Sequence, residues 1–315
     1  MNELFYRLPK DFLAKLQAVY PSHYQQILAT FLNKKTTAFR ANYLKIDLTN
    51  LRKELLKEGV RFQELNFPQG AFLSKTPLRE LQATSSYQNG LIYVQNVSSM
   101  LPAFILSPQA GEKILDLCAA PGAKTTQLAS LAKNAQITAI EKIRTRYYKL
   151  LANLKIQGAE KVTVLLLDGI WVRKKFPEYF DKILVDAPCS AESRFIIHDF
   201  HSFKYWKERK VKEMEHKQKK LLHSAFFALK TGGTLVYSTC TFSPEENEGV
   251  IEWFIDKFKD KVEVLPIDIP LPGVFAGLSS WKGERFSSSM RLVRRIIPND
   301  FMEGFFIAKM RKIAV

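Results

Sequence analysis

The chain has 315 residues, of which 46% are hydrophobic and 25% are charged, with 14 glycines and 14 prolines. This composition provides a hydrophobic core for one large or two modest domains, and it excludes a disordered, collagen-like or low-complexity chain. The 47 Lys and Arg residues outnumber the 31 Asp and Glu residues, and the net charge of +16 favours association with nucleic acid or an acidic membrane surface.

Membrane-spanning and secreted proteins are excluded by three further features. The longest apolar runs, such as residues 162–167, fall far short of the roughly 18 residues that a membrane span needs. The first residues mix acids and bases and show no apolar signal segment. Three cysteines do not make a disulfide framework. We therefore expect a cytoplasmic protein whose thiols are reduced. The sequence does not indicate an oligomeric state, and a monomer is the default expectation.

The first part of the chain predicts a small α+β module over residues 1–90. Its expected elements are an amphipathic helical stretch, a short strand, a helix, a turn-rich segment and a connecting segment, at residues 12–31, 39–46, 48–59, 67–77 and 88–96.

The second part, residues 91–315, alternates short apolar runs with helical patterns. The runs are residues 114–118, 136–141, 162–168, 181–189 and 232–240, and the helical patterns between them include residues 125–133, 146–156 and 216–230. Continuous apolar strands that alternate with helices predict a parallel sheet covered on both faces, in a doubly wound, Rossmann-like α/β fold. Residues 262–267 and 304–311 predict extra strands at one edge.

Four of the apolar runs carry an acid at or near the end of the predicted strand. Ligands of doubly wound sheets bind outside the carboxyl ends of the strands. We therefore expect carboxylates to converge where a polyhydroxyl or amino ligand would lie, and the acids are Asp116, Glu141, Asp168 and Asp186.

The turn after the first predicted strand is made of small residues that let a ligand approach the backbone. It comprises Cys118, Ala119, Ala120, Pro121, Gly122, Ala123 and Lys124. The turn matches neither a Walker loop nor G-x-G-x-x-G, so a pyrophosphate is poorly supported. Glu141 is well placed to accept hydrogen bonds from ribose hydroxyls. A nucleoside without phosphates fits, and S-adenosylmethionine (SAM) is the obvious candidate; the alternative is a tight turn without a ligand.

Two cysteines, Cys189 and Cys240, lie at the ends of neighbouring predicted strands on the rim that carries the acids. A single cysteine there is commonly a small buried apolar residue, as we expect of Cys118 unless its backbone contributes to the cofactor turn. Two cysteines beside Lys124 favour chemistry, because a neighbouring cation lowers the pKa of a thiol.

Three motifs, in this order and spacing, resemble those of the RNA cytosine-C5 methyltransferases of the Sun/Nop type. They are DLCAAPGAKT (116–125), DAPCS (186–190) and YSTCTFSPEENE (237–248), and RANYLK, YVQNVSSMLPA and EGFFIAK extend the resemblance from about residue 35 to the end. The resemblance implies that residues 91–315 form the sheet of a class I SAM methyltransferase. It also implies an enzyme that forms 5-methylcytosine in ribosomal or transfer RNA. It also implies that the module of residues 1–90 helps to place the RNA.

The resemblance also implies a role for individual residues. The turn from Cys118 to Lys124 would hold SAM, Glu141 the ribose hydroxyls and Asp168 the adenine amino group. Arg146 matches the arginine that follows the ribose-binding acid of the family. Asp186 would bond the target base near N3 beside the cofactor, Cys240 would be the nucleophile, and Cys189 would help to expel it. We expect Lys124 to be a catalytic residue as well as part of the cofactor turn.

This chain departs from the pattern of the family at two places. Ala123 stands where a second glycine is usual, which adds one methyl group. Residues 191–194 (Ala-Glu-Ser-Arg) stand where glycines usually follow DAPCS, so the geometry of the substrate beside this loop is in doubt.

Two basic segments and four histidines complete the sequence signals. Residues 207–220 predict a solvated helix face with ion pairs four residues apart. Residues 281–295 are predicted to grip RNA through phosphate contacts and stacking, or alternatively to form an edge strand protected by charge. The basic and aromatic residues of this segment are Trp281, Lys282, Arg285, Phe286, Arg291, Arg294 and Arg295. We expect no metal site, because His198, His201, His216 and His223 have no further ligand at suitable spacing.

Two other functions remain open at this point. A non-catalytic RNA-binding or ribosome-assembly protein would use the same fold without needing either cysteine. A DNA cytosine-C5 methyltransferase would use Cys189, in its Pro-Cys pair, as the nucleophile, whereas the Thr239–Cys240 pair favours RNA.

Overall fold

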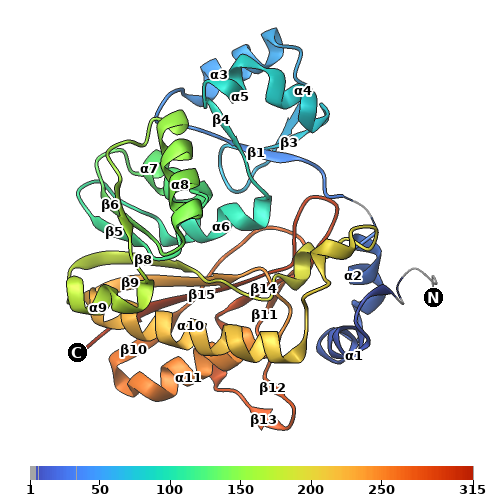
Figure 1. Ribbon diagram of the computed structural model, residues 1–315, viewed down its shortest axis with the longest axis vertical. Coiled ribbons are helices and arrows are strands. Elements are labelled where there is room, and N and C mark those ends of the chain that lie inside the picture. The colour runs from blue at the N-terminus through green and yellow to red at the C-terminus, as the bar shows by residue number, and fades with distance from the viewer. Residues whose placement is uncertain (1–4, 6, 33, 315) are drawn as a thin grey trace.

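The apolar runs of the second part assemble into one large sheet in the computed structural model, which describes residues 5, 7–32 and 34–314 (Figure 1). Its strands are β5 (Lys113–Asp116), β6 (Gln136–Glu141), β7 (Thr163–Leu166), β8 (Phe180–Asp186), β9 (Leu229–Thr239), β10 (Val262–Leu265), β11 (Val274–Ala276), β14 (Arg294–Ile296) and β15 (Phe305–Lys312). The strand order is β11-β14-β15-β9-β8-β5-β6-β7, and β10 pairs with the second half of β15.

The five predicted core strands, from β9 to β7 in that order, are mutually parallel. The later strands are antiparallel to their neighbours. The predicted doubly wound α/β fold is confirmed. The predicted strand over residues 304–311 forms as β15, but it lies between β9 and β14 rather than at the edge, because β14 and β11 extend the sheet beyond it.

Helices cover both faces of the large sheet, as the continuous apolar runs predict (Figure 1). One face packs against α6 (Val97–Leu106), α7 (Ala123–Leu131) and α8 (Arg144–Gln157), and the other against α9 (Val172–Lys175), α10 (Glu208–Ala228) and α11 (Glu248–Phe258). Successive strand residues alternate between the two cores: Ile114 and Leu184 face the first, whereas Leu115 and Val185 face the second.

A small antiparallel sheet with its own core forms much of the N-terminal module. Its order is β2 (Phe62–Glu64), β3 (Ala71–Ser74), β1 (Ala38–Ala41) and β4 (Ile92–Val94), with helices α3 (Leu48–Lys57), α4 (Leu78–Ala83) and α5 (Ser85–Gln88). The predicted helix over residues 48–59 is confirmed. It begins where the Asp47 carboxylate accepts a hydrogen bond from Asn50 N. Strand β3 lies inside the segment predicted as turns.

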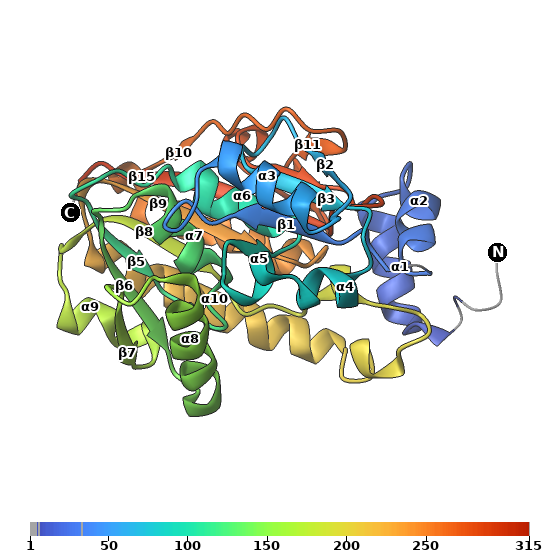
Figure 2. The ribbon, with the colours of Figure 1, turned by 90° about the horizontal axis from the view of Figure 1, so that it is seen from above.

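The first two helices, α1 (Lys10–Val19) and α2 (Tyr24–Thr30), lie apart from the small sheet (Figures 1 and 2). Phe12 and Phe31 pack instead against Phe195, Trp206 and Phe242 of the second part of the chain. Residues 1–90 are thus divided between two hydrophobic cores.

The basic helix α10 matches its prediction. Lys217 pairs with Glu213 at 2.5 Å and Lys219 with Glu215 at 2.6 Å, each four residues apart. Within the described residues, none of the helices is both long and apolar enough to cross a membrane. The remaining elements are a hairpin of β12 (Ser280–Trp281) and β13 (Glu284–Arg285), and the 3-10 turns η2 (Gly169–Trp171), η3 (Glu192–Arg194), η4 (Phe200–Ser202), η5 (Pro244–Glu246), η6 (Lys259–Lys261) and η7 (Ser288–Arg291).

Candidate active site

The carboxyl ends of the parallel strands bring the predicted acids and cysteines to one rim. Asp116, Glu141 and Asp186 are the last residues of β5, β6 and β8, and Cys240 directly follows β9. Asp168 lies just after β7. Because β5 to β9 are parallel and paired in register, these side chains share the edge where ligands of such sheets bind.

The two rim cysteines contact each other, with Cys189 Sγ 3.5 Å from Cys240 Sγ. The hydrogen bond from the Cys189 thiol lowers the pKa of Cys240, and the positive charge of Arg194 acts in the same direction, against burial. The same hydrogen bond, together with burial, raises the pKa of Cys189. The electrostatics of the site thus favour the thiolate on Cys240 and the thiol on Cys189.

Lys124 is engaged with Asp186 rather than with a cysteine. Its Nζ lies 2.7 Å from Asp186 Oδ2 and donates a 2.8 Å hydrogen bond to Ser99 Oγ. Ser238 Oγ donates to Asp186 Oδ1 at 2.8 Å. The expectation that Lys124 is the cation that acts on the thiols is thus corrected: the cation that lowers the pKa of Cys240 is Arg194.

Sequence reasoning missed Glu192, which anchors the loop that departs from the pattern of the family. This loop turns at Ala191, whose φ of 56° is left-handed. The buried Glu192 carboxylate accepts hydrogen bonds from Trp206 Nε1, Thr241 Oγ1, and the backbone and hydroxyl of Ser243, all between 2.7 and 3.0 Å. It also accepts one from Phe242 N at 2.9 Å. Glu192 thus joins the segment after Cys189 to the segment after Cys240.

A second buried acid, Glu246, was also missed. Its carboxylate accepts hydrogen bonds from Ser190 N at 3.0 Å, Gln218 Nε2 at 2.8 Å and Ser190 Oγ. Burial and the nearby charge of Glu192 raise the pKa of Glu246 to about 8. Ser190 Oγ lies 2.7 Å from Thr241 Oγ1, which bonds Glu192, so a chain of hydroxyls connects the two acids beneath the cysteine pair. Only the tertiary fold creates this arrangement.

The small-residue turn is fixed from two sides. Gly122, at φ 111°, occupies a left-handed conformation at the cap of α7, where its lack of a Cβ matters. Arg146 Nη2 donates a 2.6 Å hydrogen bond to Ala120 O, and its Nη1 lies 3.4 Å from Glu141 Oε2. Arg146 therefore connects the acid that ends β6 to the turn after β5.

The remaining rim residues differ in their surroundings. Asp168 accepts a hydrogen bond from Ile170 N at 3.2 Å, and its carboxylate lies 3.5 Å from Lys142 Nζ.

Burial and neighbouring carboxylates raise the pKa of Cys118, which makes it a poor nucleophile. Burial likewise raises the pKa of Asp116 to about 6. Its Oδ2 accepts from Thr125, whereas its buried Oδ1 has no hydrogen-bond partner within the described part of the chain.

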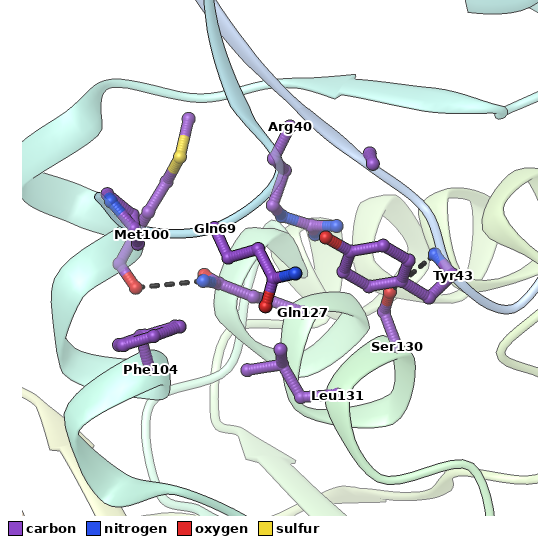
Figure 3. A pocket seen from close by; sticks show the side chains of 10 residues that line it. Arg40, Tyr43, Gln69, Met100, Phe104, Gln127, Ser130 and Leu131 are labelled. Atoms are coloured by element: carbon purple, nitrogen blue, oxygen red, sulfur yellow. Dashed lines mark hydrogen bonds between the residues drawn. The ribbon is translucent and has the colours of Figure 1, made fainter. Parts of the chain in front are cut away.

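The small N-terminal sheet holds the helix that follows the turn. From β1, Arg40 Nη2 donates hydrogen bonds to Ala123 O at 2.8 Å and Thr126 Oγ1 at 2.7 Å. Tyr43 N donates to Ser130 Oγ at 2.8 Å, two turns further along α7. Figure 3 shows Arg40, Tyr43 and Ser130 around a small pocket between the N-terminal sheet and helices α6 and α7.

The predicted RNA grip over residues 281–295 is wrong for Arg295. This side chain is buried, and its guanidinium pairs with Glu248 and donates to Tyr20 Oη at 2.6 Å and Phe242 O at 3.0 Å. Its strand, β14, lies between β11 and β15, so the alternative of a charged edge strand is wrong as well. Arg294 donates to Arg291 O at 2.8 Å.

Comparison with known proteins shows what this chain is similar to. A family profile described as 16S rRNA methyltransferase RsmB/F matches residues 103–311, and one for the N-terminal domain of 16S rRNA methyltransferase RsmF matches residues 8–97. Ribosomal RNA small subunit methyltransferase F from Klebsiella pneumoniae is 34% identical over 97% of this chain, and the same-named protein from Escherichia coli is 34% identical over 96%. The chain spans only 64% and 63% of the lengths of these two relatives.

Solved structures share the fold of this chain over nearly its whole length. A methyltransferase homolog from Pyrococcus horikoshii is 32% identical, with a TM-score of 0.86 and 99% of both chains covered. NSun6 from the same organism, at 22% identity and a TM-score of 0.83 with 99% of this chain and 100% of that chain covered, shares the fold. The resemblance carried by the three motifs is confirmed, and the chain belongs to the family of 16S rRNA methyltransferases RsmB/F.

Proposed function

We propose that this chain methylates C5 of a cytosine in RNA, with SAM as the methyl donor and Cys240 as a covalent nucleophile. The observation that carries the proposal is the contact between Cys189 and Cys240 beside Asp186, on the rim that also holds Glu141. Pure RNA binding requires no such pair of thiols. The names of the curated relatives favour small-subunit ribosomal RNA over transfer RNA or DNA as the substrate.

The residues of the rim fit SAM. The buried Asp116 Oδ1, which lacks a partner in the described chain, suits the amino group of the methionine part. Glu141 lies at the end of the second strand, where ribose hydroxyls are held in nucleotide-binding sheets. Asp168 would hold the adenine amino group, and the turn from Cys118 to Lys124 would surround the rest. Bound there, SAM supplies an electrophilic methyl group on a sulfonium.

Cys240 makes cytosine reactive. C5 of cytosine is a poor nucleophile, and addition of the Cys240 thiolate to C6 moves an electron pair toward C5 and N3. Asp186, held by Lys124 and Ser238, would bond the ring near N3 and stabilise the charge that develops there. C5 would then bond the methyl carbon, whose bond to the sulfonium sulfur breaks and leaves its electron pair on that sulfur.

Cys189 acts in the step that releases the enzyme from the methylated base. After C5 has lost its proton to a base, the electrons of that bond form the C5–C6 double bond and the Cys240 sulfur departs from C6. The Cys189 thiol, whose pKa is raised, remains a donor at 3.5 Å and stabilises the departing thiolate. This matches its proposed role in expelling the nucleophile.

The proposal includes the parts of the chain outside the rim. Residues 1–90 would place the RNA for the catalytic domain of residues 91–315, and the bonds from Arg40 to α7 support a mechanical link between the two. We propose that the protein acts as a monomer, without a metal ion. A cytoplasmic location follows from the mechanism, because a reducing compartment keeps both thiols free.

One experiment separates the proposed reaction from its alternatives. The protein is incubated with methyl-labelled SAM and, in parallel, with 16S ribosomal RNA, transfer RNA or DNA. We expect label as 5-methylcytosine in the ribosomal RNA, none with Cys240→Ser, and a covalent adduct when the RNA carries 5-fluorocytosine. Undiminished methylation by Cys240→Ser contradicts the mechanism, and RNA binding without label supports the non-catalytic alternative.

A further inference from the structure

Arg194 and Glu303 carry opposite charges near the proposed nucleophile, and their side chains contact each other. Arg194 ends the turn η3, and the preceding residue ties this turn to Cys240: Ser193 N and Ser193 Oγ donate to Cys240 O at 3.3 and 2.9 Å. These bonds fix the backbone of the turn beside Cys240, one residue before Arg194, and 57% of the Arg194 side chain is exposed.

Glu303 approaches Arg194 from the segment that precedes β15. Its carboxylate Oε2 lies 3.4 Å from Arg194 Nε. Its backbone is fixed to the start of α6, because Glu303 N donates to Asn96 Oδ1 at 3.1 Å and Ser98 Oγ donates to Glu303 O at 2.7 Å. The two charges therefore sit on segments that are anchored independently, Arg194 beside Cys240 and Glu303 beside the start of α6.

We propose that Arg194 is a positioning residue that stabilises the Cys240 thiolate, and that Glu303 limits this effect by pairing with Arg194. The proposal rests on the proposed function for its role in catalysis, because it assumes that Cys240 is the nucleophile. It gives a purpose to the loop of residues 191–194, which departs from the glycines that usually follow DAPCS in the family.

No other described cation plays this part as directly. Lys124 is committed to Asp186 and Ser99. The ionisable groups that face Cys240 are Cys189, Asp186, Arg194 and Glu303. Of these, Cys189 and Arg194 lower the pKa of Cys240, whereas Asp186 and Glu303 raise it. Arg194 is thus the positive member of the group.

The test measures the thiol itself in the full chain, without RNA or SAM. The rate of Cys240 alkylation by iodoacetamide is followed by peptide mass spectrometry as a function of pH, because only the thiolate reacts. The variants are Arg194→Gln, Arg194→Lys and Glu303→Gln. The matched control is Arg285→Gln, since Arg285 is an exposed arginine in the β12–β13 hairpin.

Neutralising Arg194 and neutralising Glu303 should shift the pH midpoint of Cys240 alkylation in opposite directions. We expect Arg194→Gln to move the alkylation midpoint up by at least about 0.5 pH unit and Glu303→Gln to move it down. Arg194→Lys should stay close to the wild type, and Arg285→Gln should match it. A midpoint in Arg194→Gln equal to that of Arg285→Gln overturns the proposal, as does loss of methylation with an unchanged midpoint, which would assign Arg194 to RNA contact.

Failure of the proposed function gives a different result. If Cys240 is not the nucleophile, Cys240→Ser retains methylation while the alkylation midpoints of the arginine and glutamate variants still shift. If Cys240 is the nucleophile, the acidic limb of the pH profile of kcat should shift in the same direction as the alkylation midpoint of each variant.

Discussion

Arg40 in the small sheet donates a 2.7 Å hydrogen bond to Thr126 Oγ1 in the first turns of α7. Thr126 Oγ1 in turn donates to Gly122 O at 2.7 Å, at the glycine that caps the helix. The buried guanidinium thus reaches from the N-terminal sheet to the proposed cofactor turn through one intervening hydroxyl.

Replacement of Arg40 by Gln should weaken SAM binding more than it weakens RNA binding. Each lost hydrogen bond to the charged group is worth about 1.5–3 kcal/mol, so thermal stability should fall as well. Isothermal titration with SAM gives the affinity, and a melting curve gives the stability. Arg52→Gln, which removes a half-buried pair with Glu64 far from the turn, serves as the control. Unchanged SAM affinity in a folded Arg40→Gln variant would contradict the link.

Cys189→Ala should trap the enzyme on its substrate. The departing Cys240 thiolate loses its hydrogen-bond donor, so release becomes slower than methyl transfer. We expect a covalent protein–RNA band on a denaturing gel after incubation with SAM and substrate RNA, absent from the double variant with Cys240→Ala. Cys118→Ala, which leaves the Cys189–Cys240 pair intact, should form no such band. If no band forms in the Cys189 variant, Cys189 has no role in release.

Glu246 should make the stability of the fold depend on pH. Its pKa is raised from 4.5 to about 8 in the folded chain, so it keeps a proton there that the unfolded chain releases. The contribution of Glu246 to the free energy of unfolding is therefore complete below pH 4.5. It decreases as the pH rises to about 8, by up to about 1.4 kcal/mol per pH unit. Chemical denaturation at several pH values should show this slope in the wild type and less of it in Glu246→Gln. The exposed Glu284→Gln should keep the wild-type slope; equal slopes in all three proteins would assign the effect to other groups.

Arg295 should matter for stability and not for RNA. Arg295→Met leaves Glu248 buried without its partner, which costs about 3–5 kcal/mol. The free energy of unfolding from urea denaturation measures this loss. The salt dependence of RNA binding by the folded fraction should match the wild type, because a buried guanidinium releases no counterion. A reduced salt slope would restore Arg295 to the RNA surface.

The sequence was sufficient for the features that depend on local pattern. Continuous apolar runs mark the parallel strands, and the strand ends locate Asp186 and both rim cysteines. Features that depend on distant partners could not be predicted. Arg295 has the same sequence signature as an exposed arginine, and only the fold brings it to Glu248. Glu192 is an acid in a loop until the segment after Cys240 turns its amides toward it.

The position of β15 has a consequence for how the protein is made. The strand that leads to Cys240, β9, pairs on one side with β8 and on the other with residues that are synthesised much later. A nascent chain that has reached only β9 presents an unpaired strand edge, and such edges invite pairing with other chains. The segment that holds Cys240 therefore acquires its final neighbours only when translation has passed residue 312.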